Sequence, residues 1–235
     1  MIDFKETAAA FTALVAQLGY ISRWHFVKAQ KTEPAADVLF DNLAITFEQE
    51  GRREDLKKTD KITCQVTQIE PSYSDPESKF VWTDRVTIRI RNTQVNPTKK
   101  LYVTGIFMSE LFEIDCETIN ENSIATPLDS GKDFFVYGGN KPSFRISFYK
   151  NILIDKWDKF NNFLKIYVSE EPFVITQFKQ LGLEYPRKDV TIKSGEEATG
   201  NRGGDRDDSF QEPKPAPLQW AVRTIELEFD TTAIV

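Results

Sequence analysis

The sequence is short of the residues on which most catalytic and metal sites depend. Histidine occurs once, at His25, so a multi-histidine metal site is excluded and any Ser/His or Cys/His mechanism would need this one side chain. Cys64 and Cys116 are far apart and form no CxxC pair, which argues against a disulfide framework or a zinc site. We expect two reduced thiols in or near the core, no catalytic residue, no metal ligand and no cofactor, and hence no enzyme.

Long apolar runs and an excess of positive charge are missing as well. No run approaches the ~20 apolar residues that a membrane-spanning helix needs, and no signal-like apolar stretch opens the chain. The formal net charge is −6 at pH 7, which argues against a general affinity for nucleic acid or anionic lipid. We therefore predict a cytoplasmic protein that binds neither nucleic acid nor membrane.

The sequence does contain enough apolar material for a large core. Hydrophobic residues make up 40% of the 235 residues, and phenylalanine alone occurs 18 times. Strand-like alternation with a period of two recurs between turn-rich loops, at residues 38–48, 61–67, 84–92, 144–149, 164–168 and 220–229. Further strands are expected in the apolar run 101–108, with a continuation at 112–114, and at 134–137. This pattern predicts a mainly β fold, an antiparallel β-sandwich of immunoglobulin-like or jelly-roll type with an amino-terminal amphipathic helix.

The stretch from Asp84 to Ile114 is expected to lie at the centre of the fold. Residues 86, 88 and 90 are Val or Ile and alternate with polar residues, and Leu101–Met108 is apolar, β-branched and aromatic. Asn96 and Pro97 supply turn signals between the two segments. The sequence therefore predicts a hairpin of two core strands.

Residues 1–33 are expected to form the amphipathic helix, and residues 34–235 the β-sandwich domain. Apolar side chains between Phe4 and about Lys31 recur every three or four residues and share one helical face: Phe4, Ala8, Phe11, Val15, Leu18 and Ile21. Pro34 stops the helix, and the Gly-, Pro- and charge-rich residues 191–217 predict a flexible loop. The apolar helical face needs a cover, either the β domain itself or another protein or domain.

Two further binding surfaces are considered. Arg85, Arg89 and Arg91 project from one face of a predicted strand, which is typical of a solvated sheet face and alternatively offers a patch for a partner. Three aromatic residues would suit a carbohydrate ligand if they are exposed: Tyr73, Trp82 and Tyr137.

A cysteine hydrolase is disfavoured. His25 lies between Trp24 and Phe26 near the expected helix end, and the simplest interpretation is an imidazole packed between the helix and the sandwich. Neither Cys64 nor Cys116 lies in a loop or at a helix start that would expose and acidify a thiolate.

Several segments, taken in order, resemble a known family. They are the helix ending in Arg23-Trp24, Pro34 with a strand after it, Asp84–Asn92 (DRVTIRIRN), Leu101–Val103 (LYV) and Phe163–Phe173 (FLKIYVSEEPF). This order resembles the β-sandwich region carboxy-terminal to the catalytic domain in microbial caspase-like (metacaspase-type) cysteine peptidases. The resemblance covers residues 20–175 and not the last sixty or so.

The resemblance implies an accessory module rather than a peptidase, because the catalytic histidine motif and the cysteine-bearing strand of such peptidases are absent from this chain. The function expected from it is a non-catalytic interaction or regulatory module associated with a caspase-like peptidase. The partner would be a caspase-like peptidase domain or a second copy of the chain. The residues expected to bind it are Phe4, Phe11, Val15, Leu18, Trp24, Arg85, Arg89 and Arg91. A stand-alone carbohydrate-binding sandwich is the alternative.

Overall fold

A computed structural model describes residues 4–32, 38–56, 60–66, 70–71, 80–82, 85–95, 100–117, 124–137, 143–145, 147–149, 158–181 and 220–232. The helices are α1 (Phe4–Ala29) and α2 (Val38–Asp41), with a 3-10 turn at Thr176–Phe178. The strands are β1 (Leu43–Gln49), β2 (Arg52–Asp55), β3 (Lys61–Gln65), β4 (Glu70–Pro71), β5 (Phe80–Trp82), β6 (Thr87–Asn92), β7 (Leu101–Met108), β8 (Ile114–Asp115), β9 (Thr126–Leu128), β10 (Asp133–Phe135), β11 (Ser147–Tyr149), β12 (Lys159–Ser169) and β13 (Trp220–Asp230). The fold is mainly β with an amino-terminal helix, as the sequence predicts.

The strands form two larger sheets and one small one. The four-stranded sheet has the order β10-β6-β1-β2, and the small sheet has the order β11-β5-β4. The six-stranded sheet runs β3-β13-β12-β7-β8, and β9 also pairs with β7. All pairs between these strands are antiparallel except β13 with β3, which is parallel, so the six-stranded sheet is mixed.

The main core lies where the two larger sheets meet. The four-stranded sheet contributes Leu43, Ile45, Phe47, Ile88 and Ile90, and the six-stranded sheet contributes Ile62, Val103, Leu164, Ile166, Ile225, Leu227 and Phe229. These residues occupy alternate positions along their strands, so each strand turns one apolar face inward. A fully buried side chain of this size stabilises the fold by roughly 1.5–3 kcal/mol, which makes this layer the main source of stability.

The outer face of the six-stranded sheet carries a second apolar cluster. Its members are Trp24 and Val27 of α1, Ile106 and Met108 of β7, Phe163 and Tyr167 of β12, and Ile114, Cys116, Ile175 and Val222. Strand β12 therefore contributes apolar residues on both faces, and every residue from Phe163 to Ser169 is buried. The last turns of α1 cover this part of the sheet.

Strands β6 and β7 do not form the predicted hairpin. β6 pairs with β1 and β10 in the four-stranded sheet, whereas β7 pairs with β12, β8 and β9 in the other. Both strands have the expected inward-facing apolar residues, but they face each other across the core instead of sharing hydrogen bonds. The apolar pattern fixes which side of a strand is buried and not which strand lies beside it.

Three local predictions also need correction. The strand expected over residues 38–48 begins only at Leu43, because Val38–Asp41 is a helical turn that buries Leu39 and Phe40. The charged segment after β1 contains a strand, β2, which pairs with β1 through Arg52–Asp55. Strand β12 starts at Lys159, within residues 151–162, which were expected to be a loop or short helical turn; Phe160 adds an inward-facing apolar residue there.

Other predictions concern residues outside the described part of the chain. The loop expected at 191–217 and Tyr73 both lie there. The side chains of Phe4 and Trp82 are likewise outside what the structure describes.

Candidate functional site

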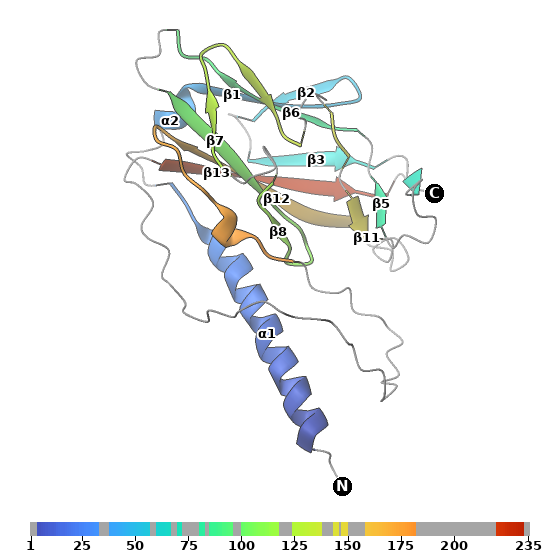
Figure 1. Cartoon of the computed structure of the whole chain (residues 1–235). Coiled ribbons are helices and arrows are strands. Elements are labelled where there is room, and N and C mark those ends of the chain that lie inside the picture. The colour runs from blue at the N-terminus through green and yellow to red at the C-terminus, as the bar shows by residue number, and fades with distance from the viewer. Residues whose placement is uncertain are drawn as a thin grey trace.

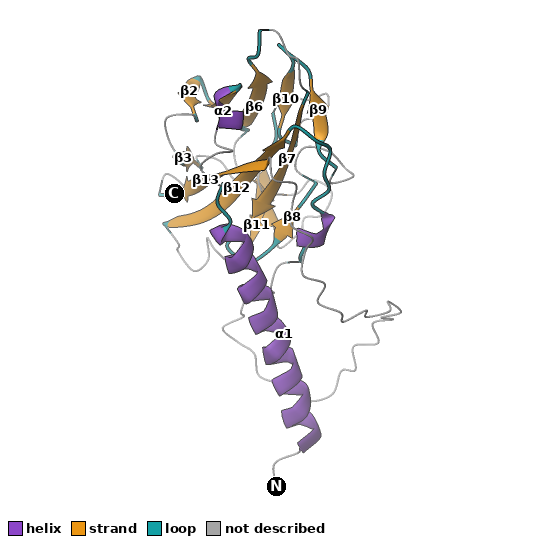
Figure 2. Cartoon of the chain, turned by 90° about the vertical axis from the view of Figure 1, so that its left-hand side faces the viewer, coloured by secondary structure: helices purple, strands orange, loops and turns teal. Residues whose placement is uncertain are grey.

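Helix α1 extends away from the strands, and its amino end lies far from them in two views at right angles (Figures 1 and 2). Every residue from Ala10 to Tyr20 is exposed. Trp24 and Val27, by contrast, are 5% and 0% exposed. The helix is therefore held at its carboxyl end and presents its earlier turns to solvent.

The exposed turns carry four large apolar side chains, which we call the apolar stripe: Phe11, Leu14, Val15 and Leu18. Their exposed fractions are 65%, 50%, 52% and 55%. Their spacing is i, i+3, i+4 and i+7, so they share one helical face. The sequence prediction included three of these residues and missed Leu14, although its spacing from Phe11 and Leu18 was visible.

The apolar stripe lies on the opposite side of the helix from the docked residues. At roughly 100° per residue, the mean direction of the stripe differs from that of Trp24 and Val27 by roughly 160°. The docked end of the helix thus faces the sheet while the stripe faces away from it. The sequence left open whether the β domain or another protein covers this face. Within the described structure the β domain does not cover it.

Aromatic packing anchors the carboxyl end of α1. The Trp24 ring meets Phe112 and Phe163 edge to face, with centroid distances of 5.4 and 5.6 Å. Lys28 Nζ lies 3.8 Å from the centre of the Phe163 ring. Trp24, which the sequence suggested for a partner, therefore packs against the chain's own sheet and is not accessible while α1 stays docked.

A buried lysine caps the helix. Lys165 Nζ donates hydrogen bonds to the carbonyl oxygens of Lys28 and Gln30, both at 2.9 Å, and the Lys165 side chain is 0% exposed. The last carbonyls of a helix lack partners within the helix and carry partial negative charge, so an ammonium group is a suitable cap. Burial, with a smaller contribution from the Lys28 charge, lowers the pKa of Lys165 to about 8.

Further polar contacts hold the segment that follows the helix. Tyr167 donates its hydroxyl hydrogen to Gln30 Oε1 at 2.8 Å. Thr32 Oγ1 donates to the Val222 carbonyl at 2.6 Å and accepts from the Val222 N–H at 2.7 Å. Together with Lys165, these contacts fix the direction in which α1 leaves the domain.

The residues proposed for cysteine catalysis have structural roles. Cys64 and Cys116 are free and buried, as predicted, and burial raises the pKa of each thiol to about 12. His25 is exposed on α1, and its ring lies 5.1 Å from Trp24 and 6.2 Å from Phe112, at the edge of the contact between helix and sheet. A thiol with so high a pKa is a poor nucleophile at neutral pH.

Arg89 and Arg91 lie on β6 in the four-stranded sheet, and Arg85 precedes that strand. Arg89 and Arg91 each approach Asp133 at 3.8 Å, and Arg91 is directly opposite Asp133 in the strand register. Arg85 is exposed and donates to Ser143 Oγ at 3.4 Å. Asp133 offsets part of this positive charge, which favours the solvated sheet face over a strongly basic patch.

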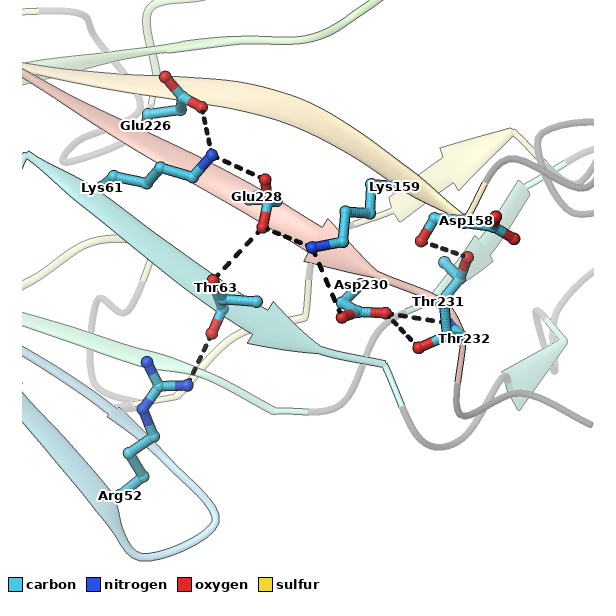
Figure 3. A network of polar contacts seen from close by, with 10 residues as sticks. All are labelled: Arg52, Lys61, Thr63, Asp158, Lys159, Glu226, Glu228, Asp230, Thr231 and Thr232. Carbon is cyan, nitrogen blue, oxygen red and sulfur yellow. Dashed lines mark hydrogen bonds and ion pairs between the residues drawn. The ribbon is translucent and has the colours of Figure 1, made fainter.

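A ladder of charged side chains covers one end of the outer face of the six-stranded sheet (Figure 3). Lys61 Nζ lies 3.1 Å from Glu226 and 2.7 Å from Glu228, and Lys159 Nζ lies 3.2 Å from Glu228 and 3.9 Å from Asp230. Hydrogen bonds from Lys61 and Lys159 lower the pKa of Glu228. The carboxylates are thus matched by lysines, and within the described residues no group of three or more His, Cys, Asp or Glu side chains could hold a metal ion.

Side chains of the four-stranded sheet cover the free edge of β3. Arg52 donates to the Thr63 carbonyl at 2.8 Å, as Figure 3 shows. Gln49 donates to the Gln65 carbonyl at 2.7 Å and accepts from the Gln65 N–H at 3.2 Å. An unpaired strand edge is a template for another strand, so these contacts make β3 a poor site for strand addition.

Of the three aromatic residues considered for carbohydrate, only Tyr137 has a side chain within the described structure. The Tyr137 ring packs against Phe144 and Phe107, with centroid distances of 5.0 and 6.1 Å, and its hydroxyl donates to Asp115 at 2.8 Å. Tyr137 keeps 37% of its surface exposed, but its ring is already held by two aromatic neighbours.

Comparisons with protein-family models, with curated proteins and with solved structures find no match to this chain. The resemblance to the metacaspase region therefore stays a prediction from the sequence. Among the described helices, none is long and apolar enough to cross a membrane.

Proposed function

We propose that this chain is a non-catalytic interaction domain, in which the β domain holds α1 in a fixed direction and the apolar stripe binds a protein. The observation that carries the proposal is the exposure of Phe11, Leu14, Val15 and Leu18 on a helix whose opposite face is docked. The spacing of these four residues is the one by which helices insert into apolar grooves or pair with other helices.

The magnitude of the exposed area supports a binding role. For side-chain areas of ~150–200 Å², the four exposed fractions leave on the order of 400 Å² of apolar surface in one row. The largest apolar patch on a typical monomeric protein is roughly 300–600 Å², so the stripe is of that size, and such patches are often functional. Burying it would contribute roughly 25 cal/mol per Å².

Three finer statements belong to this proposal. The β domain is a sandwich of immunoglobulin-like or jelly-roll type, which the shared core of the two larger sheets supports. The chain works in the cytoplasm, where two unpaired cysteines would stay reduced. A caspase-like peptidase is one candidate partner, supported by the sequence resemblance alone.

Photo-crosslinking tests the proposal. A photoreactive amino acid replaces Val15 in one variant and Ala13, which is exposed on the docked side of the helix, in a matched control. Irradiation in cells that express the chain is expected to give discrete adducts from position 15 and few from position 13. Equal, diffuse labelling from both positions, or none from either, would remove the support for a docking helix.

A purified caspase-like peptidase domain provides the second arm. Binding by isothermal calorimetry that is lost in Leu18→Glu and kept in Ala13→Glu would identify this partner. Absence of binding would remove the peptidase as a partner and leave the crosslinking result to decide the broader proposal.

A further inference from the structure

We propose that the partner of the apolar stripe is the stripe of a second copy of the chain, so that two α1 helices pair as a short coiled coil. The inference rests on the proposed function and specifies its partner. It is carried by the heptad spacing of the exposed part of α1 and by the absence of charge there.

The spacing fits a helix pair. Phe11 and Leu18 occupy successive a positions of a heptad, and Leu14 and Ile21 occupy the d positions between and after them. Binding in a groove of an unrelated protein would need only the four stripe residues. The heptad pattern continues beyond them to Ile21, close to the point where α1 reaches the sheet, as expected for a helix pair. Because the stripe and the docked face lie on opposite sides of α1, the two β domains of a pair would lie on the outside and would not block the contact.

The charge pattern favours an identical partner. The segment from Thr7 to Ser22 contains no Asp, Glu, Lys or Arg. The e and g positions, which select partners in coiled coils through opposite charges, are Ala10, Val15, Gln17 and Ser22. A neutral seam does not repel its own copy, and it offers a different protein no charge to recognise. It also lacks the Lys and Arg residues with which amphipathic helices hold anionic lipid, and the chain has a net charge of −6.

The area predicts a weak, reversible dimer. Two stripes together present on the order of 800 Å² before the flanking alanines are counted, which is below the ~1,200 Å² at which stable interfaces begin. A twofold-symmetric contact uses the same patch on both copies, and this is the commonest arrangement among homo-oligomers. We therefore expect a dimer that dissociates on dilution.

Sedimentation velocity over a concentration series tests the inference on the full chain. The wild-type mass is expected to rise from that of the 27.0 kDa monomer towards twice that value. Leu14→Glu and Leu18→Glu should stay monomeric at every concentration, and Ala13→Glu should behave like the wild type. Because the stripe does not touch the β domain, the urea midpoint of each variant should match the wild type, which separates lost pairing from lost folding.

Ionic strength and crosslinking complete the test. The dissociation constant should change less than about twofold between low and high salt, because the seam carries no charge. A wild-type chain that stays monomeric, or a Leu14→Glu variant that still dimerises, would overturn the inference. If the chain is monomeric but still gives adducts with another protein from position 15, the docking function is kept and only the pairing with a second copy is rejected. If it gives no adducts, both proposals fail.

Discussion

The Lys165 cap allows one quantitative prediction about pH. Replacing Lys165 by Met keeps much of the side-chain volume and removes the amine that binds the Lys28 and Gln30 carbonyls. Two part-buried acceptors then lose their donor, at a cost of at most about 1–3 kcal/mol each. At neutral pH this cost is offset in part, because the variant no longer buries a charge.

The size of the offset follows from the pKa of Lys165, which burial lowers from 10.5 to about 8. Between these two values the unfolded chain binds more protons at this site than the folded chain, so stability rises with pH. At 1.36 kcal/mol per pKa unit, the wild type gains about 2 to 3 kcal/mol from Lys165 between pH 7 and pH 10. The destabilisation caused by Lys165→Met should therefore be larger at pH 10 than at pH 7 by the same amount.

Urea unfolding of the wild type and the variant at the two pH values measures this difference, since other titrating groups are common to both proteins. Lys159→Met, which removes an exposed lysine from the same strand, is the matched control. A destabilisation by Lys165→Met that is the same at both pH values would refute the reasoning, because it would mean that the amine is not buried against the helix carbonyls.

Three other perturbations test separate parts of the structure. Trp24→Ala should destabilise the domain by about 3–5 kcal/mol in urea unfolding and speed amide exchange in the last turns of α1, because it empties the contact between helix and sheet; unchanged exchange there would mean that α1 is held without this ring. Cys64 and Cys116 should not react with an aromatic disulfide reagent in the native chain and should both react in urea, so rapid native labelling would contradict their burial. Glu228→Gln should cost less than about 1 kcal/mol at low salt and still less at high salt, since its lysine partners are exposed; a larger, salt-independent loss would show that the ladder is a buried network.

The sequence predicted the faces of the strands better than their neighbours. Ile225, Leu227 and Phe229 were expected on one face of a strand, and all three are buried in the core. This succeeds because a period of two is a local property of the chain. Strand pairing is not a local property. The hairpin predicted from the sequence therefore paired β6 with β7, although the two strands belong to different sheets.

The candidate site was predictable in part for the same reason. The helical spacing of Phe11, Val15 and Leu18 is local, and their exposure agrees with a face that needs an external cover. The role of Lys165 could not be predicted, because its acceptors are backbone carbonyls more than a hundred residues away in the chain. Trp24 and the stripe residues are all large apolar residues of one helix, so the sequence gives them the same expected role. Only the structure shows that Trp24 packs against the sheet and that the stripe residues face outward.

The parallel pairing of β3 with β13 has a consequence for biosynthesis. Lys61 and its partner Glu228 are 167 positions apart, so during translation β3 emerges long before the strand that completes its hydrogen bonding. Contacts of such high separation slow folding and leave apolar strands exposed to other nascent chains. The hydrogen bonds from Arg52 and Gln49 can form much earlier, because these residues lie within sixteen positions of their β3 partners. These hydrogen bonds would cover one edge of β3 during translation, before β13 is synthesised and pairs with the other edge.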